Sequence, residues 1–276
     1  MSGQRTIKFF IEKREMECKV IGSMRPAEDV CLLSQDDNLL EHTKYDEAGF
    51  GITSLFTQEE FFALKTDLEL LVKKRLANFT SNSLDGFTLE TYHKYVSDEE
   101  HLDFMSSIKS CIDINEFPLD KAVISRRIGE SLSQKIGFTC EGLDNREFFC
   151  LRLVRPGNHR DCNPPHKDVY IDRLRNAVNL YAPICGSDEN SSLSVIEKSH
   201  RWLESDMEVS ENGVEVNGVK YSVPAICSTK NGFRMTRPNP QYGDVLFFSP
   251  YLIHGAGYNF NKNTTRVSLE IRLWKA

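Results

Sequence analysis

The sequence predicts an α+β chain with a mostly β core, a sandwich or cupin-like jelly roll, and supporting N-terminal helices. The chain has 276 residues, 40% of them apolar, which is enough for one substantial core. Apolar residues recur at helical spacing in the first half, whereas short apolar runs bounded by Pro, Gly, Asn and Asp fill the second. We therefore expect a single domain over 1–276, mainly helical over 1–147 and a jelly-roll core over 148–276.

Three helices are expected before the β core. The clearest covers 57–79, where Thr57 precedes a run of acids that suits the positive end of a helix dipole. Apolar residues then recur near helical spacing, which predicts one buried face. Further helices are predicted over 98–111 and 119–136, and residues 1–56 show no clear pattern.

The second half predicts many short strands with turns between them, as in a jelly roll. A hairpin is predicted over 214–221, because Asn217-Gly218 is a favoured two-residue turn. The stretch 201–241 is long and is interpreted as an insertion, a candidate lid or partner surface. The remaining strands are predicted over 148–154, 168–171, 177–181, 192–196, 245–249 and 266–274.

The composition argues against nucleic-acid and membrane partners. With 34 basic and 40 acidic side chains the net charge is −6, whereas phosphate contacts need clustered Lys and Arg. No apolar run is long enough to span a bilayer, and the N-terminus lacks the apolar segment of a secretory signal. Eight cysteines without a CxxC pair favour free thiols over zinc or disulfides. We expect a cytoplasmic protein with a small-molecule substrate; the oligomeric state is left open.

The segment Pro165-His166-Lys167-Asp168 carries two candidate metal ligands. On a strand, His166 and Asp168 would project from the same face. A second histidine, His254, lies 86 positions (254 − 168) after Asp168. Two imidazoles and one carboxylate form the facial triad that binds ferrous iron and leaves coordination positions open. Because His-x-Asp alone is common by chance, the case depends on the residues downstream of His254.

Arg266 supplies the second part of the pattern. It lies twelve positions after His254 and alternates with Ser268 onto one face of the last predicted strand. A guanidinium can hold a carboxylate bidentately, and the serine hydroxyl can add a further hydrogen bond. The distal carboxylate of 2-oxoglutarate fits this role, and its 2-oxo acid end can chelate iron.

Taken together, these motifs resemble the phytanoyl-CoA dioxygenase family of Fe(II)- and 2-oxoglutarate-dependent oxygenases. The resemblance covers roughly 148–274, and the chain departs from it at Glu197-Lys198, where Pro-Gly is usual. These motifs, taken together and in this order, are more specific than any one of them alone: Arg155-Pro156-Gly157, Pro165-His166-Lys167-Asp168, Asn190 to His200, Gly243-Asp244-Val245, His254-Gly255 and Arg266-Val267-Ser268.

The resemblance implies a double-stranded β-helix with helices packed on one side. It also implies Fe(II), 2-oxoglutarate and O₂ as cofactor and co-substrates, with succinate and CO₂ as products. Related halogenases carry a small residue in place of the carboxylate ligand, so Asp168 favours hydroxylation or another oxidation over halogenation. In the family the histidine matching His200 is structural, and we assign His200 that role.

Four residues are weaker candidates. Asn179 and Tyr181 share a strand face and are predicted to point into the barrel toward 2-oxoglutarate, although ordinary core hydrogen bonding is an equal alternative. Tyr170, on the predicted face of the metal ligands, and Arg152 are candidates for substrate contacts.

The sequence therefore predicts a dioxygenase that hydroxylates a C–H bond of a small polar metabolite, such as a sugar, an amino acid or a natural-product intermediate. One alternative is an acyl-CoA hydroxylase of the same family, although no strong CoA-binding signal is present. Another is a non-catalytic, cupin-like binding module. A protein or nucleic-acid demethylase is disfavoured by the acidic charge. Fold alone does not decide among these, because one fold hosts many chemistries.

Overall fold

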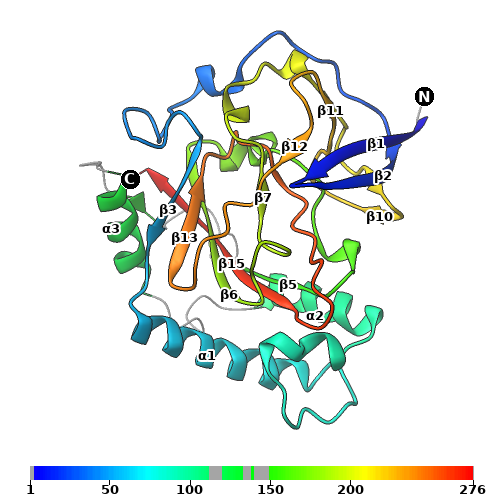
Figure 1. Cartoon of the computed structure of the whole chain (residues 1–276), viewed down its shortest axis with the longest axis vertical. Coiled ribbons are helices and arrows are strands. Elements are labelled where there is room, and N and C mark those ends of the chain that lie inside the picture. Colours follow the sequence, from blue (N-terminus) through cyan, green and yellow to red (C-terminus); the bar gives the residue numbers. More distant parts are fainter. Residues whose placement is uncertain (1–2, 112–119, 133–137, 140–148, 276) are drawn as a thin grey trace.

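The computed structural model describes residues 3–111, 120–132, 138–139 and 149–275. Its centre is an antiparallel sheet, called here the major sheet, which runs in the order β3-β13-β6-β15-β4, with β5 also paired to β15 (Figure 1). Strand β6 is buried throughout, β13 is buried at all but its first residue, and β15 is buried mainly in its first half. The strands are β3 (Phe50–Ser54), β4 (Phe138–Thr139), β5 (Phe149–Val154), β6 (Ala177–Cys185), β13 (Asp244–Phe248) and β15 (Arg266–Lys275).

A smaller antiparallel layer, called here the minor layer, consists of β7 (Ser194–Val195) and β14 (His254–Gly255). Single bridges extend it on either side, from His166 to His254 and from Val195 to Thr236. The chain passes alternately between the layers, from β5 to His166, β6, β7, β13, β14 and β15. This alternation is the double-stranded β-helix, or jelly roll, that was expected, and the core is mostly β.

The three helices lie where the sequence predicted them. They are α1 (Gln58–Leu76), α2 (Asp98–Cys111) and α3 (Lys121–Ser131); the predicted outer parts of the third helix, at 119 and 133–136, lie outside the described residues. Thr57 and Glu60 form a capping box that starts α1, since each side chain accepts from the other's backbone N–H. No helix within the described ranges has both the length and the apolar character needed to cross a bilayer.

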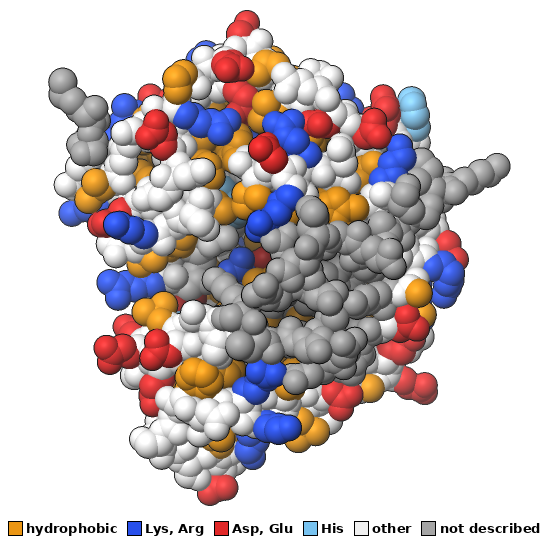
Figure 2. Space-filling view, turned by 180° about the vertical axis from the view of Figure 1, so that it is seen from behind, with side chains coloured by type: hydrophobic (Ala, Val, Ile, Leu, Met, Phe, Trp, Pro, Cys, Tyr) orange, Lys and Arg blue, Asp and Glu red, His pale blue; other side chains and the backbone are white. Residues whose placement is uncertain are grey.

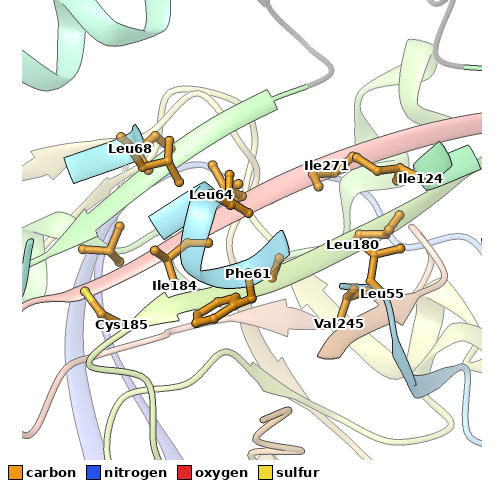
Figure 3. Close-up of a cluster of buried hydrophobic side chains, with 14 of the residues drawn as sticks. Leu55, Phe61, Leu64, Leu68, Ile124, Leu180, Ile184, Cys185, Val245 and Ile271 are labelled. Carbon is orange, nitrogen blue, oxygen red and sulfur yellow. The ribbon is translucent and has the colours of Figure 1, made fainter. Parts of the chain in front are cut away.

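The helices cover the outer face of the major sheet and create the largest apolar core. One face of α1 contributes Phe61, Leu64 and Leu68, which lie against side chains of β6, β13 and β15 (Figure 3). The sheet contributes every second residue of β15, because successive strand side chains point to opposite faces. The four apolar residues Val267, Leu269, Ile271 and Leu273 therefore face the helices, and the polar residues between them face the interior of the barrel.

Before the helices, where the sequence showed no clear pattern, the described N-terminal residues form strands. A β-hairpin of β1 (Gly3–Ile11) and β2 (Arg14–Gly22) precedes the helices and lies apart from them (Figure 1). It pairs with strands of the predicted insertion to give a sheet in the order β10-β9-β2-β1-β12, while β8 and β11 of the insertion pair with each other. The strands of the insertion are β8 (Met207–Val209), β9 (Glu215–Val216), β10 (Val219–Lys220), β11 (Ile226–Thr229) and β12 (Arg234–Met235).

The insertion therefore packs with the N-terminal hairpin on the minor layer. A second apolar core joins Phe9 and Ile11 of β1 to Met207 and Val209 of β8, and to Ile253 beside β14. The turn at Asn217-Gly218 connects β9 and β10 as predicted, with both residues at positive φ.

The predicted strand over 168–171 is wrong. Asp168–Tyr170 forms the 3-10 turn η5, and the Ile171 N–H donates to the Asp168 carbonyl at 2.9 Å, which closes a turn instead of joining a ladder. The remaining predicted strands of the core are confirmed with shifted ends; residue 148 is outside the described ranges. The other 3-10 turns are η1 (Leu32–Gln35), η2 (Leu89–Lys94), η4 (His159–Asp161), η6 (Asp172–Leu174), η7 (Ser199–Arg201) and η8 (Glu204–Asp206).

Candidate metal centre

The structure brings His166, Asp168 and His254 together. The Asp168 Oδ1 atom lies 3.3 Å from His166 Nε2 and 3.7 Å from His254 Nε2. One ligand atom from each residue lies within 4.8 Å of the others, and all three side chains are buried. Among the described His, Cys, Asp and Glu residues, no other group of three has this arrangement. Its two nitrogens and one anionic oxygen match the donor set that ferrous iron takes in a facial triad.

Backbone contacts fix the tautomer of both histidines. His166 Nδ1 lies 2.7 Å from the Pro164 carbonyl oxygen, and His254 Nδ1 lies 3.0 Å from that of Leu252. Because a carbonyl oxygen only accepts, each Nδ1 carries the proton, and each Nε2 presents a lone pair toward Asp168. Metal-binding histidines are oriented in this way by a hydrogen bond at the other ring nitrogen. The site is thus arranged to bind a cation.

The two histidines also form a cross-strand pair in the minor layer. The His166 N–H donates to the His254 carbonyl, and the His254 N–H donates to the His166 carbonyl, both at 2.9 Å. Gly255, next in the chain, has φ +116°, and a Cβ there would lie 2.6 Å from the Pro164 carbonyl oxygen and 3.0 Å from His166 Nδ1. Glycine at 255 therefore allows the two ligand-bearing segments to approach closely.

Two donors hold the second carboxylate oxygen of Asp168. Asn179 Nδ2 donates to Asp168 Oδ2 at 3.1 Å, and an Nη of Arg272 donates to the same atom at 3.2 Å. Burial raises the pKa of Asp168, but the positive charge of Arg272, the largest of the opposing effects, helps to bring it well below its ordinary value. The carboxyl is therefore ionised, with Oδ1 directed at the histidines.

His254 is neutral at physiological pH. Burial, followed by the neighbouring His166, lowers the pKa of His254 to about 4. A histidine binds a metal in its neutral form, so no proton has to be displaced from this ligand.

Arg266 lies in the same pocket, fully enclosed but without an ion-pair partner among the described residues. Only 4% of it is exposed. One Nη donates to Ser268 Oγ at 2.9 Å, the other approaches the Gly257 carbonyl at 3.4 Å, and Nε has no partner. A buried cation without a counter-ion is costly, so this guanidinium is poised to receive an anion.

Two further residues support this cationic end of the site. The Tyr181 ring centre lies 5.7 Å from Arg266 Cζ, within cation–π range, and the Tyr181 hydroxyl pairs with Ser187 at 2.8 Å. Arg237 is also buried, donating to the carbonyls of Ser192 and Tyr258. Burial, and then the charge of Arg266, lowers the pKa of Arg237 to about 10.

A single pocket between the layers contains the candidate ligands and Arg266. Of the residues predicted to bind the co-substrate, Arg266 and Asn179 line the pocket. Tyr181 and Ser268 do not line it but contact Arg266. The pocket is lined by Arg152, Asp161, Cys162, Asn163, His166, Asp168, Asn179, Leu180, Leu193, Phe248, His254, Gly255, Ala256, Gly257, Arg266, Glu270, Ile271 and Arg272.

The two residues predicted for substrate contact are placed differently. Arg152 lines the pocket, but its Nε and an Nη donate to the two carboxylate oxygens of Glu270 at 2.9 and 3.1 Å. Burial raises the pKa of Glu270, but Arg152 and Arg272 bring it down to about 2. Tyr170 is not among the pocket residues, and its hydroxyl donates to Glu204 at 3.0 Å.

Sequence reasoning missed Arg272 and Glu270, although a signal existed. Polar side chains alternate with apolar ones from Arg266 through Ser268 to Arg272, so one face of β15 is polar throughout. Extending the same alternation beyond Ser268 would have placed both residues beside the ligands.

Comparisons with known proteins show neither a family nor an activity. No family model matches the chain, and no curated protein is similar to it in sequence. AviO1 from Streptomyces viridochromogenes Tue57 aligns with a TM-score of 0.47 at 15% identity, over 91% of this chain and 97% of that one.

Two further solved structures align similarly. The epimerase SnoN, in complex with Fe3+, alpha ketoglutarate and nogalamycin RO, aligns with a TM-score of 0.45 at 14% identity, over 86% of this chain and 84% of that one. EctD from S. alaskensis with 2-oxoglutarate and 5-hydroxyectoine gives 0.44 at 12% identity, over 100% of this chain and 86% of that one. Because these TM-scores are all below 0.5, no function is transferred from these proteins, and the interpretation of the metal site depends on the geometry of this chain.

Proposed function

We propose that the chain is an Fe(II)- and 2-oxoglutarate-dependent dioxygenase that hydroxylates a C–H bond of a small polar metabolite. The observation that carries the proposal is the shared pocket: three ligand atoms within 4.8 Å of one another, beside a buried arginine that has no anionic partner among the described residues. Membership of the phytanoyl-CoA dioxygenase family is part of the proposal and rests on the ordered motifs of the sequence.

His166, Asp168 and His254 would hold the metal on one side, which leaves its other side open to the pocket. Bound ferrous iron, with O₂ and 2-oxoglutarate, supplies the oxidising power that converts C–H to C–OH, releasing succinate and CO₂. Asn179 and Arg272 keep Asp168 Oδ2 occupied, so Oδ1 is the oxygen that would be free to hold the metal.

Arg266 would bind the distal carboxylate of 2-oxoglutarate. Its two Nη groups form a fork suited to two carboxylate oxygens, and Ser268 fixes the orientation of that fork. The guanidinium lies against Gly257 and is almost inaccessible to water, which strengthens its electrostatic interaction with an anion. The protein thereby orients the co-substrate and excludes water from it.

A polar substrate suits the remaining wall of the pocket. Arg152 and Glu270 bring a buried ion pair to its surface, and the Asn179 Oδ1 atom is a buried acceptor without a partner among the described residues. An all-apolar substrate would leave Asn179 Oδ1 unsatisfied. The pocket therefore favours a substrate with hydrogen-bond donors, such as hydroxyl or amino groups.

A nucleic-acid substrate is not part of the proposal. Figure 2 shows acidic and basic side chains intermingled over one face of the molecule, without an extended basic region on its described part. The net charge of −6 points the same way.

We also propose that the protein is cytoplasmic, because its eight cysteines lack the spacing of a disulfide framework or a zinc site.

The test is a turnover assay with purified chain under controlled oxygen. We expect uptake of about one Fe(II) per chain and, with 2-oxoglutarate and a screen of polar metabolites, iron-dependent formation of succinate measured by mass spectrometry. His166→Ala should abolish iron uptake, while Arg126→Ala, an exposed arginine on α3, should not. Iron uptake without succinate formation for any compound would favour the binding-module alternative, and absence of both would refute the proposal.

A further inference from the structure

Lys167, which lies between two candidate metal ligands, is buried on the side away from the pocket. Only 1% of it is exposed, and it does not line the pocket. Its Nζ donates to Glu204 Oε1 at 3.0 Å. A lysine is rarely enclosed in this way unless its charge is paired. The partner, Glu204, belongs to the insertion, in η8.

Glu204 connects three segments of the chain. Its other carboxylate oxygen accepts from Arg25 at 2.8 Å and from the Tyr170 hydroxyl at 3.0 Å. The Arg25 guanidinium also stacks on the Tyr170 ring, 3.9 Å from its centre. Glu204 itself is 5% exposed, and its N–H donates to the Val30 carbonyl at 2.8 Å. The insertion, the segment after β2 and the metal-binding loop thus share one buried carboxylate.

The loop that carries His166 and Asp168 depends on such contacts, because it is not a regular strand. From the jelly roll it receives the paired bonds to His254 and one from the Val169 N–H to the Pro250 carbonyl at 3.1 Å. From the insertion it receives the Ile226 N–H, which donates to the Pro165 carbonyl at 2.8 Å, and the Glu204 carboxylate. The loop therefore has hydrogen bonds to the jelly roll on one side and to the insertion on the other.

We propose that Glu204 is a positioning residue that acts through Lys167 to hold His166 and Asp168 in ligand geometry. This inference rests on the proposed function, since it assumes that these residues bind a metal. It assigns a role to the insertion and to the N-terminal segment around Arg25: together they brace the metal-binding loop from outside the jelly roll. Groups that orient metal ligands typically change metal affinity by about 10- to 100-fold when removed.

The variants must separate positioning from stability. Glu204→Gln leaves Lys167 without its carboxylate, and a buried unpaired charge is strongly destabilising. The double variant Lys167→Met with Glu204→Gln removes both buried charges, so most stability should return while the link remains absent. The matched control is Glu208→Gln, the same change in the same insertion, where the carboxylate pairs with Arg5 and is 55% exposed.

The measurement is anaerobic Fe(II) titration of each full-length chain by calorimetry, with folding checked by circular dichroism. We expect the double variant to be folded and to bind Fe(II) about 10-fold or more weakly than the wild type, and Glu208→Gln to bind normally. A role in stability alone would restore affinity in the double variant. Binding by the folded double variant within about twofold of the wild type would overturn the inference.

A second measurement uses the wild type alone, in case the double variant does not fold. Coupling between two sites is reciprocal, so Fe(II) must stabilise the contacts of Glu204 if these contacts stabilise the metal site. We expect Fe(II) to slow hydrogen exchange at the amides of Glu204 and Arg25, which donate to Val30 and Val209. Unchanged hydrogen exchange at these two amides, at saturating Fe(II), would overturn this inference but leave the proposed function standing. No Fe(II) binding by the wild type would refute the proposed function and the inference with it.

Discussion

Replacing Arg266 with methionine should separate co-substrate binding from folding. In the ligand-free chain this buried guanidinium has no ion-pair partner among the described residues and keeps a short hydrogen bond only to Ser268. Arg266→Met relieves an unpaired buried charge but leaves the Ser268 hydroxyl without its donor. These two effects oppose each other, so we expect the unfolding free energy to change by no more than about 1 kcal/mol.

The effect on 2-oxoglutarate binding should be much larger. A hydrogen bond to a charged group contributes about 1.5–3 kcal/mol, and two are lost, which gives about 3–6 kcal/mol. Since about 1.4 kcal/mol corresponds to a tenfold change, the dissociation constant should rise by about two to four orders of magnitude. Lysine at 266 should recover only part of this loss, because an ammonium cannot form the paired fork.

The assay is urea unfolding of the Fe(II)-loaded chain with and without 2-oxoglutarate. At a ligand concentration of about 100 times the wild-type dissociation constant, binding should stabilise the wild type by about 2.7 kcal/mol. Arg266→Met should show almost no such gain, while Arg126→Met, exposed on α3, should show all of it. A ligand-dependent gain equal to that of the wild type in Arg266→Met would show that the carboxylate binds elsewhere.

The contacts of the site lead to three further predictions. Arg272→Met removes one of two donors to Asp168 Oδ2 and should weaken Fe(II) binding about 10-fold in calorimetry; unchanged binding would contradict the proposed support of this ligand. Gly255→Ala, where a Cβ meets backbone at 2.6 Å, should lower the unfolding free energy by at least about 2 kcal/mol more than Gly213→Ala, which meets nothing; equal losses in thermal unfolding would refute the steric argument. Burial lowers the pKa of His200 to about 4, from 6.5, so the unfolded chain binds the extra proton and stability falls as pH drops through that window. In His200→Gln the unfolding free energy should fall less steeply between pH 6.5 and about pH 4. An unchanged slope would count against the lowered pKa of His200.

The candidate metal ligands and Arg266 could be predicted because these residues occur in short sequence patterns. His166 and Asp168 stand two residues apart, and Arg266 alternates with Ser268. Strand alternation can place Asn179 and Arg272 on the inner faces of their strands, but it cannot predict that both bond to Asp168, because they lie 11 and 104 positions away from it along the chain. Only the folded sheet makes these residues neighbours.

The fold shows the same division between local and long-range causes. The limits of α1 follow from Thr57 and the apolar spacing, which are local. The conformation of 168–171 depends on Pro250, which is distant in the chain, so its apolar residues gave a misleading strand pattern. The hairpin β1–β2 had a readable alternation in Ile7, Phe9 and Ile11, but the strands that pair with it lie in the insertion.

The reciprocal backbone bonds between His166 and His254 couple the positions of the two histidines. Each residue both donates to and accepts from the other, although 88 positions (254 − 166) separate them in the sequence. Withdrawing one histidine breaks both of these backbone bonds to the other, so the two ligands lose this support together. A local opening of this pair would displace both imidazoles at once, so a bound metal would be lost in a single cooperative event instead of by stepwise detachment of ligands.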